Sequence, residues 1–360
     1  MSGVAVAMSG GVDSSVAAVL LRQQGYDVIG ITMQIMDNSR AADEAKSVAN
    51  LLGIPHHTFD IRKEFNEQII NYFVDEYRSG RTPNPCVKCN RLIKFGLLME
   101  KAKGLGADFL ATGHYARVLP PSPIPFPQGV RGFKLLKGKD KTKDQSYALY
   151  TMDQETLAHA LFPLGELTKN EVRDKAKKIG SSSAERKDSQ EICFIEDNDY
   201  GRFLKERMPE QCKPGPVLDI NGKQVGTHEG ILFYTIGQRK GIGAHKGMPK
   251  YVIAIDPKTN AIIIGDDKDT LKLSLIAANV TLVSGSILSG EMEITAKIRY
   301  NGPEVPAKVA ALGENSVKLM FREPQRAVTP GQSVVFYSGD EVLGGRDNKR
   351  GRRSRWRVKG

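Results

Sequence analysis

Short apolar runs alternate with longer amphipathic segments through the first third of the chain. Four runs have the length and composition of buried strands, at residues 4–8, 26–33, 56–60 and 108–112. Between them, apolar residues recur at helical spacing around 14–22, 41–52 and 65–77. This alternation predicts right-handed crossovers and a mainly parallel sheet, and therefore an α/β fold. Because ligands of such sheets bind beyond the carboxyl ends of the strands, the turn after Met8, the region near Met33 and Gly113-His114 become candidate site positions.

The pattern changes in the second half of the chain. Repeated prolines at 120–127 predict an extended loop, and a helical pattern returns around 168–180. From about Cys212, glycine and proline separate short β-rich runs, which is typical of small sandwiches or barrels. These runs cover residues 251–255, 261–265, 293–300, 307–311, 316–321 and 332–337. We expect an N-terminal α/β domain at 1–198, a small β-rich central domain at 199–268, a C-terminal β-barrel at 269–343 and a tail at 344–360.

The composition is that of a globular protein with two or three domains: 360 residues, of which 40% are hydrophobic and 26% are charged. The first twelve residues contain neither Lys nor Arg, and their apolar run is short, so we expect no secretory signal. No apolar stretch reaches the ~18–20 residues that a membrane span needs. Four cysteines are too few for a disulfide scaffold and predict a cytoplasmic protein with reduced thiols.

The net charge of +11 is concentrated at one end of the chain. Residues 344–360 contain eight Lys or Arg and one Asp, which leaves +7 in this segment and +4 in the other 343 residues. A basic protein is expected to bind a polyanion such as nucleic acid, although a basic tail alone can produce this balance. We expect a disordered tail that adds salt-dependent affinity for such a partner.

The turn after the first strand has the residues of a phosphate-binding loop. In Ser9-Gly10-Gly11-Val12-Asp13-Ser14-Ser15, the glycines allow a ligand close to the backbone, and the N–H groups of a helix start favour an anion. Serine hydroxyls can add hydrogen bonds, whereas Asp13 would repel phosphates unless Mg²⁺ lies between them. The loop follows neither the GxxxxGK[ST] nor the GxGxxG pattern. A tight turn with a serine N-cap would account for the same residues.

With this loop the chain resembles the PP-loop ATP pyrophosphatases, and among them most closely the tRNA-specific 2-thiouridylases. Further motifs follow in order along nearly the whole chain: TPNPCVKCN, IKF, LATGHYAR, KDQSY, KDSQEICFI, YTIGQRKG and AVTPGQ. The resemblance implies an adenine nucleotide alpha hydrolase-like N-terminal domain that cleaves ATP between the α- and β-phosphates and transfers AMP to a substrate oxygen. In this family the oxygen is that on C2 of the wobble uridine in a tRNA anticodon, and sulfur then replaces it.

Three cysteines stand in two of these motifs. Cys86 and Cys89 form a CxxC, and Cys193 follows about a hundred residues later. Taken by themselves, they leave several functions open: a zinc site, which would need more ligands, a redox pair, an iron–sulfur cluster with one open iron, or a nucleophile with a sulfur carrier. Cys212 matches no functional position of the family, and we expect it to be structural.

The resemblance favours the last of these functions. It implies that Cys89 is the catalytic nucleophile and that Cys193 carries the sulfur as a persulfide, with a Cys89–Cys193 disulfide after transfer. That disulfide needs Cα atoms within roughly 7 Å. Lys88 and Lys187, which neighbour these cysteines in sequence, could favour the thiolates. At Cys86 the family has Asp or Cys, so a carboxylate role is not transferred to it. A [4Fe-4S] cluster on Cys86, Cys89 and Cys193, as in related thiolation enzymes, stays an alternative.

The resemblance also assigns binding residues. ATP, with Mg²⁺, is expected to contact Ala7, Met8, Ser9, Gly10, Gly11, Val12, Asp13, Ser14, Met33 and Gly113. The tRNA is expected to contact Asn84, Pro85, Cys86, His114, Lys143, Asp144, Gln145, Arg299, Tyr300 and Gln332. Met33, His114 and Tyr300 would serve equally as core residues, whereas Arg299 has the chemistry to pair with phosphate. No resident metal is implied. The sulfur donor would be a cysteine desulfurase or a sulfur-relay protein.

Two other functions have to be distinguished from tRNA thiolation. An amide-forming ligase of the same superfamily would need ATP but no essential cysteine, so the Cys193→Ala variant would stay active. An RNA-binding β module with a degenerate nucleotide fold would bind tRNA without Asp13, and mixing ATP with tRNA would then release no pyrophosphate.

Overall fold

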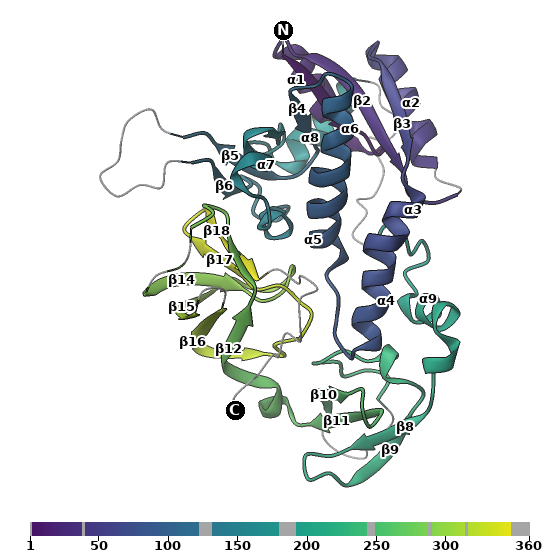
Figure 1. The fold of residues 1–360 in the computed structure, drawn as a ribbon, viewed down its shortest axis with the longest axis vertical. Coiled ribbons are helices and arrows are strands. Elements are labelled where there is room, and N and C mark those ends of the chain that lie inside the picture. The colour runs from purple at the N-terminus through teal and green to yellow at the C-terminus, as the bar shows by residue number, and fades with distance from the viewer. Residues whose placement is uncertain are drawn as a thin grey trace.

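A computed structural model of the chain describes residues 2–37, 40–121, 132–179, 192–242, 249–286, 288, 290–313 and 316–346. Its strands form a parallel sheet of five strands, a mixed sheet of four and an antiparallel sheet of nine. Figure 1 shows the parallel sheet at the top, the nine-stranded sheet at the left and the mixed sheet at the bottom. Most of the predicted loop at 120–127 lies outside the described residues.

The parallel sheet confirms the α/β prediction for the N-terminal part. Its order is β3-β2-β1-β4-β7, and every neighbouring pair is parallel. The strands are β1 (Gly3–Ala7), β2 (Asp27–Gln34), β3 (His56–Asp60), β4 (Phe109–Ala111) and β7 (Ala160–Leu161), accompanied by helices α1 (Val12–Gln23), α2 (Arg40–Leu52) and α8 (Lys169–Lys178). Val4 and Val6 pack into one hydrophobic cluster with α1 and α2, and Ala5 packs into another. Since both faces of β1 are covered, its sequence is a continuous apolar run.

Two long helical segments lie beside this sheet. The first comprises α3 (Arg62–Phe65), η1 (Asn66–Ile70) and α4 (Asn71–Arg78), where a helix is predicted. The second comprises α5 (Pro85–Cys89), η2 (Asn90–Leu98) and α6 (Met99–Gly104), and it is not among the predicted helices. Segments η1 and η2 are π-helical, a conformation that is rare and often marks functional sites. In Figure 1 the second segment stands upright between the nine-stranded sheet and α4.

The nine-stranded sheet forms the C-terminal barrel and includes a hairpin from the N-terminal part. Its order is β12-β16-β15-β14-β17-β18-β6-β5, and β13 pairs with β18. The C-terminal strands are β12 (Leu271–Ala278), β13 (Val280–Leu282), β14 (Glu291–Lys297), β15 (Val305–Gly313), β16 (Ser316–Arg326), β17 (Val335–Ser338) and β18 (Glu341–Arg346). The hairpin consists of β5 (Ala116–Leu119) and β6 (Lys134–Lys137), and Leu136 pairs with Glu341. This shared sheet ties the barrel to the N-terminal part.

The end of β18 corrects the predicted start of the tail at residue 344. Gly344 and Gly345 pair with β13 and β17, and Arg346 is buried. A Cβ at Gly345 would lie 2.5 Å from the Val334 carbonyl oxygen, so glycine permits this close strand contact. Residues 344–346 therefore belong to the sheet. The remainder of the predicted tail, 347–360, lies outside the described residues.

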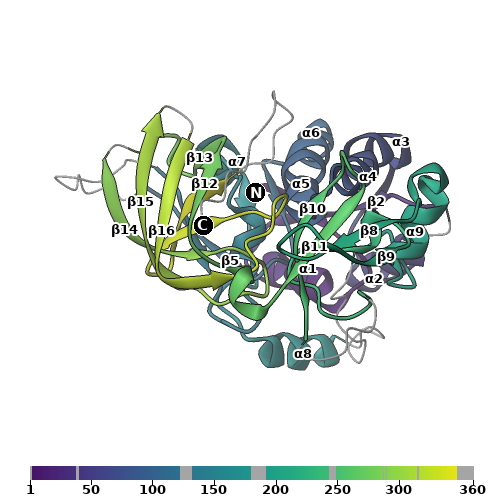
Figure 2. The same ribbon diagram turned by 90° about the horizontal axis from the view of Figure 1, so that it is seen from below.

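The mixed sheet forms the β-rich central part of the chain. Its strands β8 (Gly215–Leu218), β9 (Gln224–His228), β10 (Tyr251–Asp256) and β11 (Ala261–Gly265) lie in the order β10-β11-β8-β9, after helix α9 (Tyr200–Arg207). Figure 2, seen from below, shows this sheet beside the barrel. Shorter elements are η3 (Ser146–Leu149), α7 (Gln154–Ala158), η4 (Pro209–Gln211), η5 (Ile231–Phe233) and η6 (Asp267–Thr270). Within the described ranges, no helix combines the length and the apolar character needed to cross a membrane.

Candidate active site

The predicted phosphate-binding loop joins β1 to α1. The N-cap of α1 is Gly11, which has no side chain, so the alternative of a serine N-cap is wrong. The Ser14 and Ser15 hydroxyls instead donate to the Gly11 carbonyl oxygen at 3.1 and 2.9 Å. The Ser9 N–H donates to the Ser14 Oγ at 3.2 Å. The serines thus shape the turn from within, and the backbone of the α1 start is left to meet an anion.

Two glycines allow close approaches at this turn. Gly10 has a φ of +72°, and a Cβ there would lie 2.5 Å from the Cβ of Glu44. A Cβ at Gly113 would lie 2.9 Å from the backbone carbon of Asp13. The segment after β4 therefore presses directly against the first turn of α1.

The carboxyl ends of three strands meet at the same edge of the sheet. Ala7 pairs with Ile31, and Val6 pairs with Ala111, which brings the predicted nucleotide residues of β1, β2 and the segment after β4 together. Met33 lies two residues beyond Ile31, the last residue of β2 that pairs with β1. Its side chain is partly buried and packs against two hydrophobic clusters. The predicted ATP residues thus form one continuous edge.

Asp13 is the anionic residue of the turn, and it is engaged by another helix. The Lys169 Nζ lies 2.8 and 2.9 Å from its two carboxylate oxygens. The Tyr115 hydroxyl donates to the same carboxylate at 2.8 Å. Neither Lys169 nor Tyr115 is among the predicted site residues.

The CxxC pair lies on the second helical segment. Asn84 is the N-cap of α5, and its side chain accepts from the Val87 N–H, while the buried Pro85 occupies the first turn. Cys86 is exposed and Cys89 half-buried, and both thiols are free. The π-helical η2 begins directly after Cys89. The predicted tRNA contacts Asn84, Pro85 and Cys86 therefore stand at the start of a helix.

Cys193 belongs to the same neighbourhood. Its neighbours Ile192 and Phe194 pack in one hydrophobic cluster with Cys89, and Met33 packs against this cluster as well. The structure therefore brings together the predicted nucleophile, the segment that carries the predicted persulfide and the nucleotide edge. Within the described ranges, no three His, Cys, Asp or Glu side chains are placed to hold a single metal ion.

The surroundings disfavour thiolates in the resting site. Desolvation by the surrounding protein raises the pKa of Cys89 to about 12, and the neighbouring Cys193 and Cys86 add to this rise. Desolvation likewise raises the pKa of Cys193 to about 11, although its side chain still reaches solvent. For both groups the positive charge of Lys94 acts in the opposite direction and lowers the pKa.

Among the described residues, Lys94 and not the predicted Lys88 is therefore the lysine whose charge lowers the pKa of these thiols. The ammonium of Lys88 lies 4.6 Å from the ring centre of Tyr72 in a cation–π contact, and Lys187 lies outside the described residues. Within a π-helix of about 4.4 residues per turn, Lys94 lies nearer the face of Cys89 than an α-helix would place it. The motif IKF therefore contributes a cation to the cysteines.

His114 is a buried residue between the two parts of the site. Its Nδ1 shares a 2.7 Å hydrogen bond with the Thr112 hydroxyl, and its ring packs against Phe95 and Phe162. Burial, and then the charge of Lys94, holds the pKa of His114 well below its usual value, so the ring is neutral. A contact between this buried ring and tRNA stays a prediction.

Three predicted tRNA residues, Lys143, Asp144 and Gln145, follow one another directly before η3. The Asp144 carboxylate accepts from the Gly138 N–H at 3.0 Å and from the Ser146 hydroxyl at 2.9 Å, and Gln145 accepts from the Tyr115 N–H at 3.0 Å. Lys143 stands beside them, its N–H bonded to the Asp140 carbonyl at 3.0 Å.

Tyr300 of the barrel faces this group. It is exposed and packs edge-on against Tyr147 with ring centres 5.8 Å apart. Partial desolvation by the surrounding protein raises the pKa of Tyr300, and the nearby Asp144 and Cys86 raise it further. An exposed aromatic ring beside Cys86 suits a stacking contact with an unpaired base.

Arg299 and Gln332 hold protein segments together. The Arg299 guanidinium donates to the Ala327 carbonyl at 2.6 Å, the Thr329 hydroxyl at 2.9 Å and the Ile236 carbonyl at 3.3 Å. It therefore joins the motifs YTIGQRKG and AVTPGQ across two sheets. The Gln332 side chain donates to the Pro83 carbonyl at 2.8 Å, directly before the CxxC helix.

Three family models match successive parts of the chain. They are the tRNA methyl transferase HUP domain at residues 2–197, the tRNA methyl transferase PRC-barrel domain at 201–266 and the aminomethyltransferase beta-barrel domain at 272–346. A tRNA-specific 2-thiouridylase MnmA of Carboxydothermus hydrogenoformans is 48% identical over 95% of this chain and 96% of its own. The chain belongs to the tRNA-specific 2-thiouridylase family. The predicted family and fold class are thereby confirmed.

Other members of the family are equally similar. The tRNA-specific 2-thiouridylase MnmA 1 of Caldanaerobacter subterraneus is 50% identical over 95% of this chain and 96% of its own. MnmA of Clostridium perfringens is 46% identical over 95% and 97%. A solved 4-thiouridine synthetase–RNA complex with bound ATP is 16% identical, covers 58% of this chain and 51% of that one, and has a TM-score of 0.34, which is too low to bear on function.

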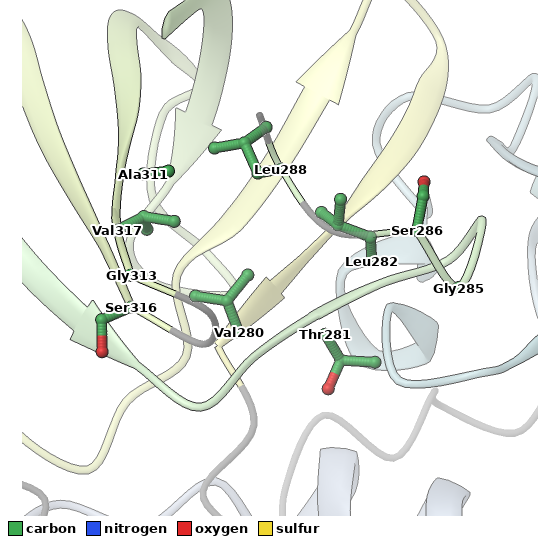
Figure 3. Close-up of a pocket in the computed structure, with 10 residues that line it drawn as sticks. All are labelled: Val280, Thr281, Leu282, Gly285, Ser286, Leu288, Ala311, Gly313, Ser316 and Val317. Atoms are coloured by element: carbon green, nitrogen blue, oxygen red, sulfur yellow. The ribbon is translucent and has the colours of Figure 1, made fainter. Parts of the chain in front are cut away.

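The candidate site described above does not coincide with the cavity shown in Figure 3. This cavity of about 190 Å³ lies in the barrel, lined by residues such as Val280, Leu282, Ser286 and Val317. None of its described lining residues is charged or carries a thiol. The cavity therefore offers neither a nucleophile nor a charged ligand group. Cys212 packs against the same hydrophobic cluster as Cys89, and its Sγ donates to the Met208 carbonyl oxygen at 3.5 Å.

Proposed function

We propose that this chain catalyses ATP-dependent 2-thiolation of the wobble uridine in tRNA anticodons, with Cys89 as nucleophile and Cys193 as persulfide carrier. The observation that carries the proposal is the shared hydrophobic cluster on which Met33, Cys89 and the neighbours of Cys193 converge. Through this cluster, the sheet edge that would bind the nucleotide lies next to the two predicted catalytic thiols. The names of the relatives, tRNA-specific 2-thiouridylases, support the reaction class.

The reaction needs both halves of the site. The uracil C2 oxygen is a poor leaving group, so its attack on the α-phosphate of ATP, with loss of pyrophosphate, first converts it to an adenylate. The terminal sulfur of the Cys193 persulfide then attacks C2 and displaces AMP. Attack of the Cys89 thiolate on the Cys193 sulfur breaks the S–S bond, releases the 2-thiouridine and leaves a Cys89–Cys193 disulfide. A dithiol reductant restores both thiols.

The residues of the nucleotide edge have defined tasks in this proposal. The start of α1 and the backbone of Ser9–Ser14 bind the phosphates, and Gly113 lets the chain pass close behind them. Mg²⁺ prefers oxygen ligands, but both oxygens of Asp13 accept hydrogen bonds from Lys169, so the phosphate oxygens of ATP would carry the ion. The adenine side would lie near Met33.

The tRNA would approach where Cys86, Tyr300 and the segment 143–145 meet. Asn84 and Pro85 would position the target base at the start of α5. The buried His114 would be a further contact to the tRNA. Arg299 and Gln332 would contribute to tRNA binding indirectly, because they hold the segments around Ala327 and Pro83 in place. Since tRNA and a cysteine desulfurase or sulfur-relay protein are the required partners, we propose a cytoplasmic location.

The proposed division of the chain follows its three sheets. We place the catalytic part at 1–198, the central part at 199–268 and the barrel from 269 to Arg346. The matches of the family models to 2–197, 201–266 and 272–346 support these bounds.

A single-turnover assay with three serine variants tests the function. Unmodified tRNA, ATP and a cysteine desulfurase with cysteine are mixed with anaerobically purified protein, and 2-thiouridine and pyrophosphate are measured. Cys89→Ser and Cys193→Ser should abolish thiolation and spare pyrophosphate release, while Cys212→Ser, the matched control, should retain both. Iron present in stoichiometric amount and lost together with activity would favour the cluster alternative. An active Cys193→Ser variant would contradict the sulfur-carrier role.

A further inference from the structure

The phosphate-binding turn has an unusual charge for its task. Residues 9–15 contain no Lys or Arg, and their one charged side chain is Asp13. The start of a helix offers only about half a positive charge to an anion. A carboxylate in the first turn of α1 would offset that charge and repel a polyphosphate.

A lysine from a distant part of the chain meets this carboxylate. The Lys169 side chain is only 7% exposed, and its Nζ donates to both oxygens of Asp13 at 2.8 and 2.9 Å. The Tyr115 hydroxyl adds a third hydrogen bond at 2.8 Å. A lysine this deeply buried is rare unless it is paired, so this ion pair is part of the folded core rather than a solvent-exposed surface pair.

The backbone around Lys169 is fixed by its own contacts. Thr168 caps α8 in a capping box with Glu171, and the Lys169 N–H donates to the Asp140 carboxylate at 2.9 Å. Helix α8 packs against α1, which carries Asp13. The ammonium group is thus held at the turn by a helix start that has little freedom to move.

We propose that Lys169 is a positioning residue that neutralises Asp13, so that the turn accepts ATP. The inference rests on the proposed nucleotide function of this turn. Lys169 supplies from α8 the positive charge that the turn itself lacks. Its effect on ATP passes through the aspartate, because its ammonium group is directed to both carboxylate oxygens.

The Lys169→Met variant keeps most of the side-chain volume and removes the charge. Asp13 would then face the phosphates uncompensated. An added unit charge some 6 Å from a phosphate, at an effective dielectric constant of about 20, corresponds to a loss of affinity on the order of 100-fold. Lys169→Arg keeps the charge and should lose less than Lys169→Met.

The decisive variant is the double substitution Asp13→Asn with Lys169→Met. If Lys169 acts by neutralising Asp13, removing both charges should restore affinity to within about tenfold of the wild type. If Lys169 contacted the phosphates directly, the double variant would bind as weakly as Lys169→Met or more weakly. A purely structural lysine would lower thermal stability in both variants without this rescue.

The measurement is calorimetric titration with α,β-methylene ATP, which resists cleavage between the α- and β-phosphates, at fixed free Mg²⁺. The expected order of affinity is wild type, then the double variant, then Lys169→Met. Equal binding by Lys169→Met and wild type, or no rescue in the double variant, would overturn the inference. Should Lys169→Met not fold, comparing Asp13→Asn with the double variant still decides: removal of Lys169 from the neutral background should change affinity less than about threefold, and a larger loss overturns the inference. A wild-type protein that binds no nucleotide would instead refute the proposed function.

Discussion

The barrel loop at 327–332 presses on the chain just before the CxxC helix, and the Gly331→Ala variant tests this contact. Gly331 has a φ of +97°, and a Cβ there would lie 2.4 Å from the carbonyl oxygen of Thr82 and 2.8 Å from its nitrogen. The neighbouring Pro330 carbonyl accepts from the Thr82 N–H at 2.9 Å. Any added side chain must therefore displace the segment that leads into Asn84.

The size of the effect follows from this geometry. Ordinary contacts begin near 3.4 Å, so Thr82 has to move by about 1 Å. The unfavourable φ costs about 1–3 kcal/mol, and overpacking adds about 1–3 kcal/mol to the loss of stability. A shift of about 1 Å in a catalytic group can cost on the order of 100-fold in rate. We expect single-turnover thiolation to fall by that factor, since Cys86 and Cys89 follow directly on the displaced segment.

The Gly331→Ala variant should lose thiolation activity but keep its affinity for nucleotide. The affinity for α,β-methylene ATP should stay within about twofold of the wild type, because the nucleotide edge lies on other elements. Gly339→Ala is the matched control: its φ is +58°, but no described atom lies within 4 Å of a Cβ built there. Unchanged thiolation in Gly331→Ala, or an equal loss in Gly339→Ala, would refute the proposed coupling of barrel and helix.

Three further predictions concern the thiols, the junction and the tail. Because the pKa of Cys89 is raised to about 12, its thiolate fraction, and hence its rate of alkylation by iodoacetamide, should rise about tenfold per pH unit between pH 7 and 10. The Lys94→Met variant should be alkylated more slowly at each pH, and a plateau of the rate below pH 9 would contradict the raised pKa. Arg299→Ala should lower the free energy of unfolding by about 1–3 kcal/mol in a denaturant titration and leave the salt dependence of tRNA binding unchanged, whereas a reduced salt dependence would show that Arg299 binds phosphate. Deletion of 347–360, which removes seven Lys or Arg and one Asp, should weaken tRNA binding modestly in a salt-dependent way and spare single-turnover thiolation, and a lost chemical step would place the tail in the site.

The nucleotide edge was largely predictable because it depends on local pattern. The run at 4–8, the glycine turn and the following amphipathic helix are contiguous, and their order fixes where the carboxyl ends of the strands lie. The position of Cys89 could likewise be named from its motif. The fold class followed from the same alternation of strands and helices together with the later β-rich runs.

The helix that carries the CxxC pair escaped prediction for a physical reason. Its central part is π-helical, and the buried Ile93 lies off the i, i+3, i+4 spacing of the buried Phe95, Leu98 and Met99. One local feature could have revealed its start. Asn84 followed by Pro85 is a typical N-cap with proline in the first turn.

Contacts over long sequence distances could not be predicted from local pattern. The pairing of Lys169 with Asp13 joins residues 156 positions apart, and the hairpin β5–β6 joins the barrel through β18. The same holds for Arg299, whose charge predicted a phosphate contact but whose guanidinium bonds to three protein oxygens. The sequence shows that a side chain is charged, but only the fold determines which groups it contacts.

The central claim, sulfur transfer from Cys193 with Cys89 as the resolving thiol, is tested most directly by stoichiometry. Persulfide-loaded protein is freed of reductant and mixed with excess tRNA and ATP, and the 2-thiouridine formed is compared with the Cys89–Cys193 disulfide found by mass spectrometry of peptides. The account predicts one disulfide for each 2-thiouridine, and neither product without ATP. Formation of 2-thiouridine while both thiols remain free would contradict it.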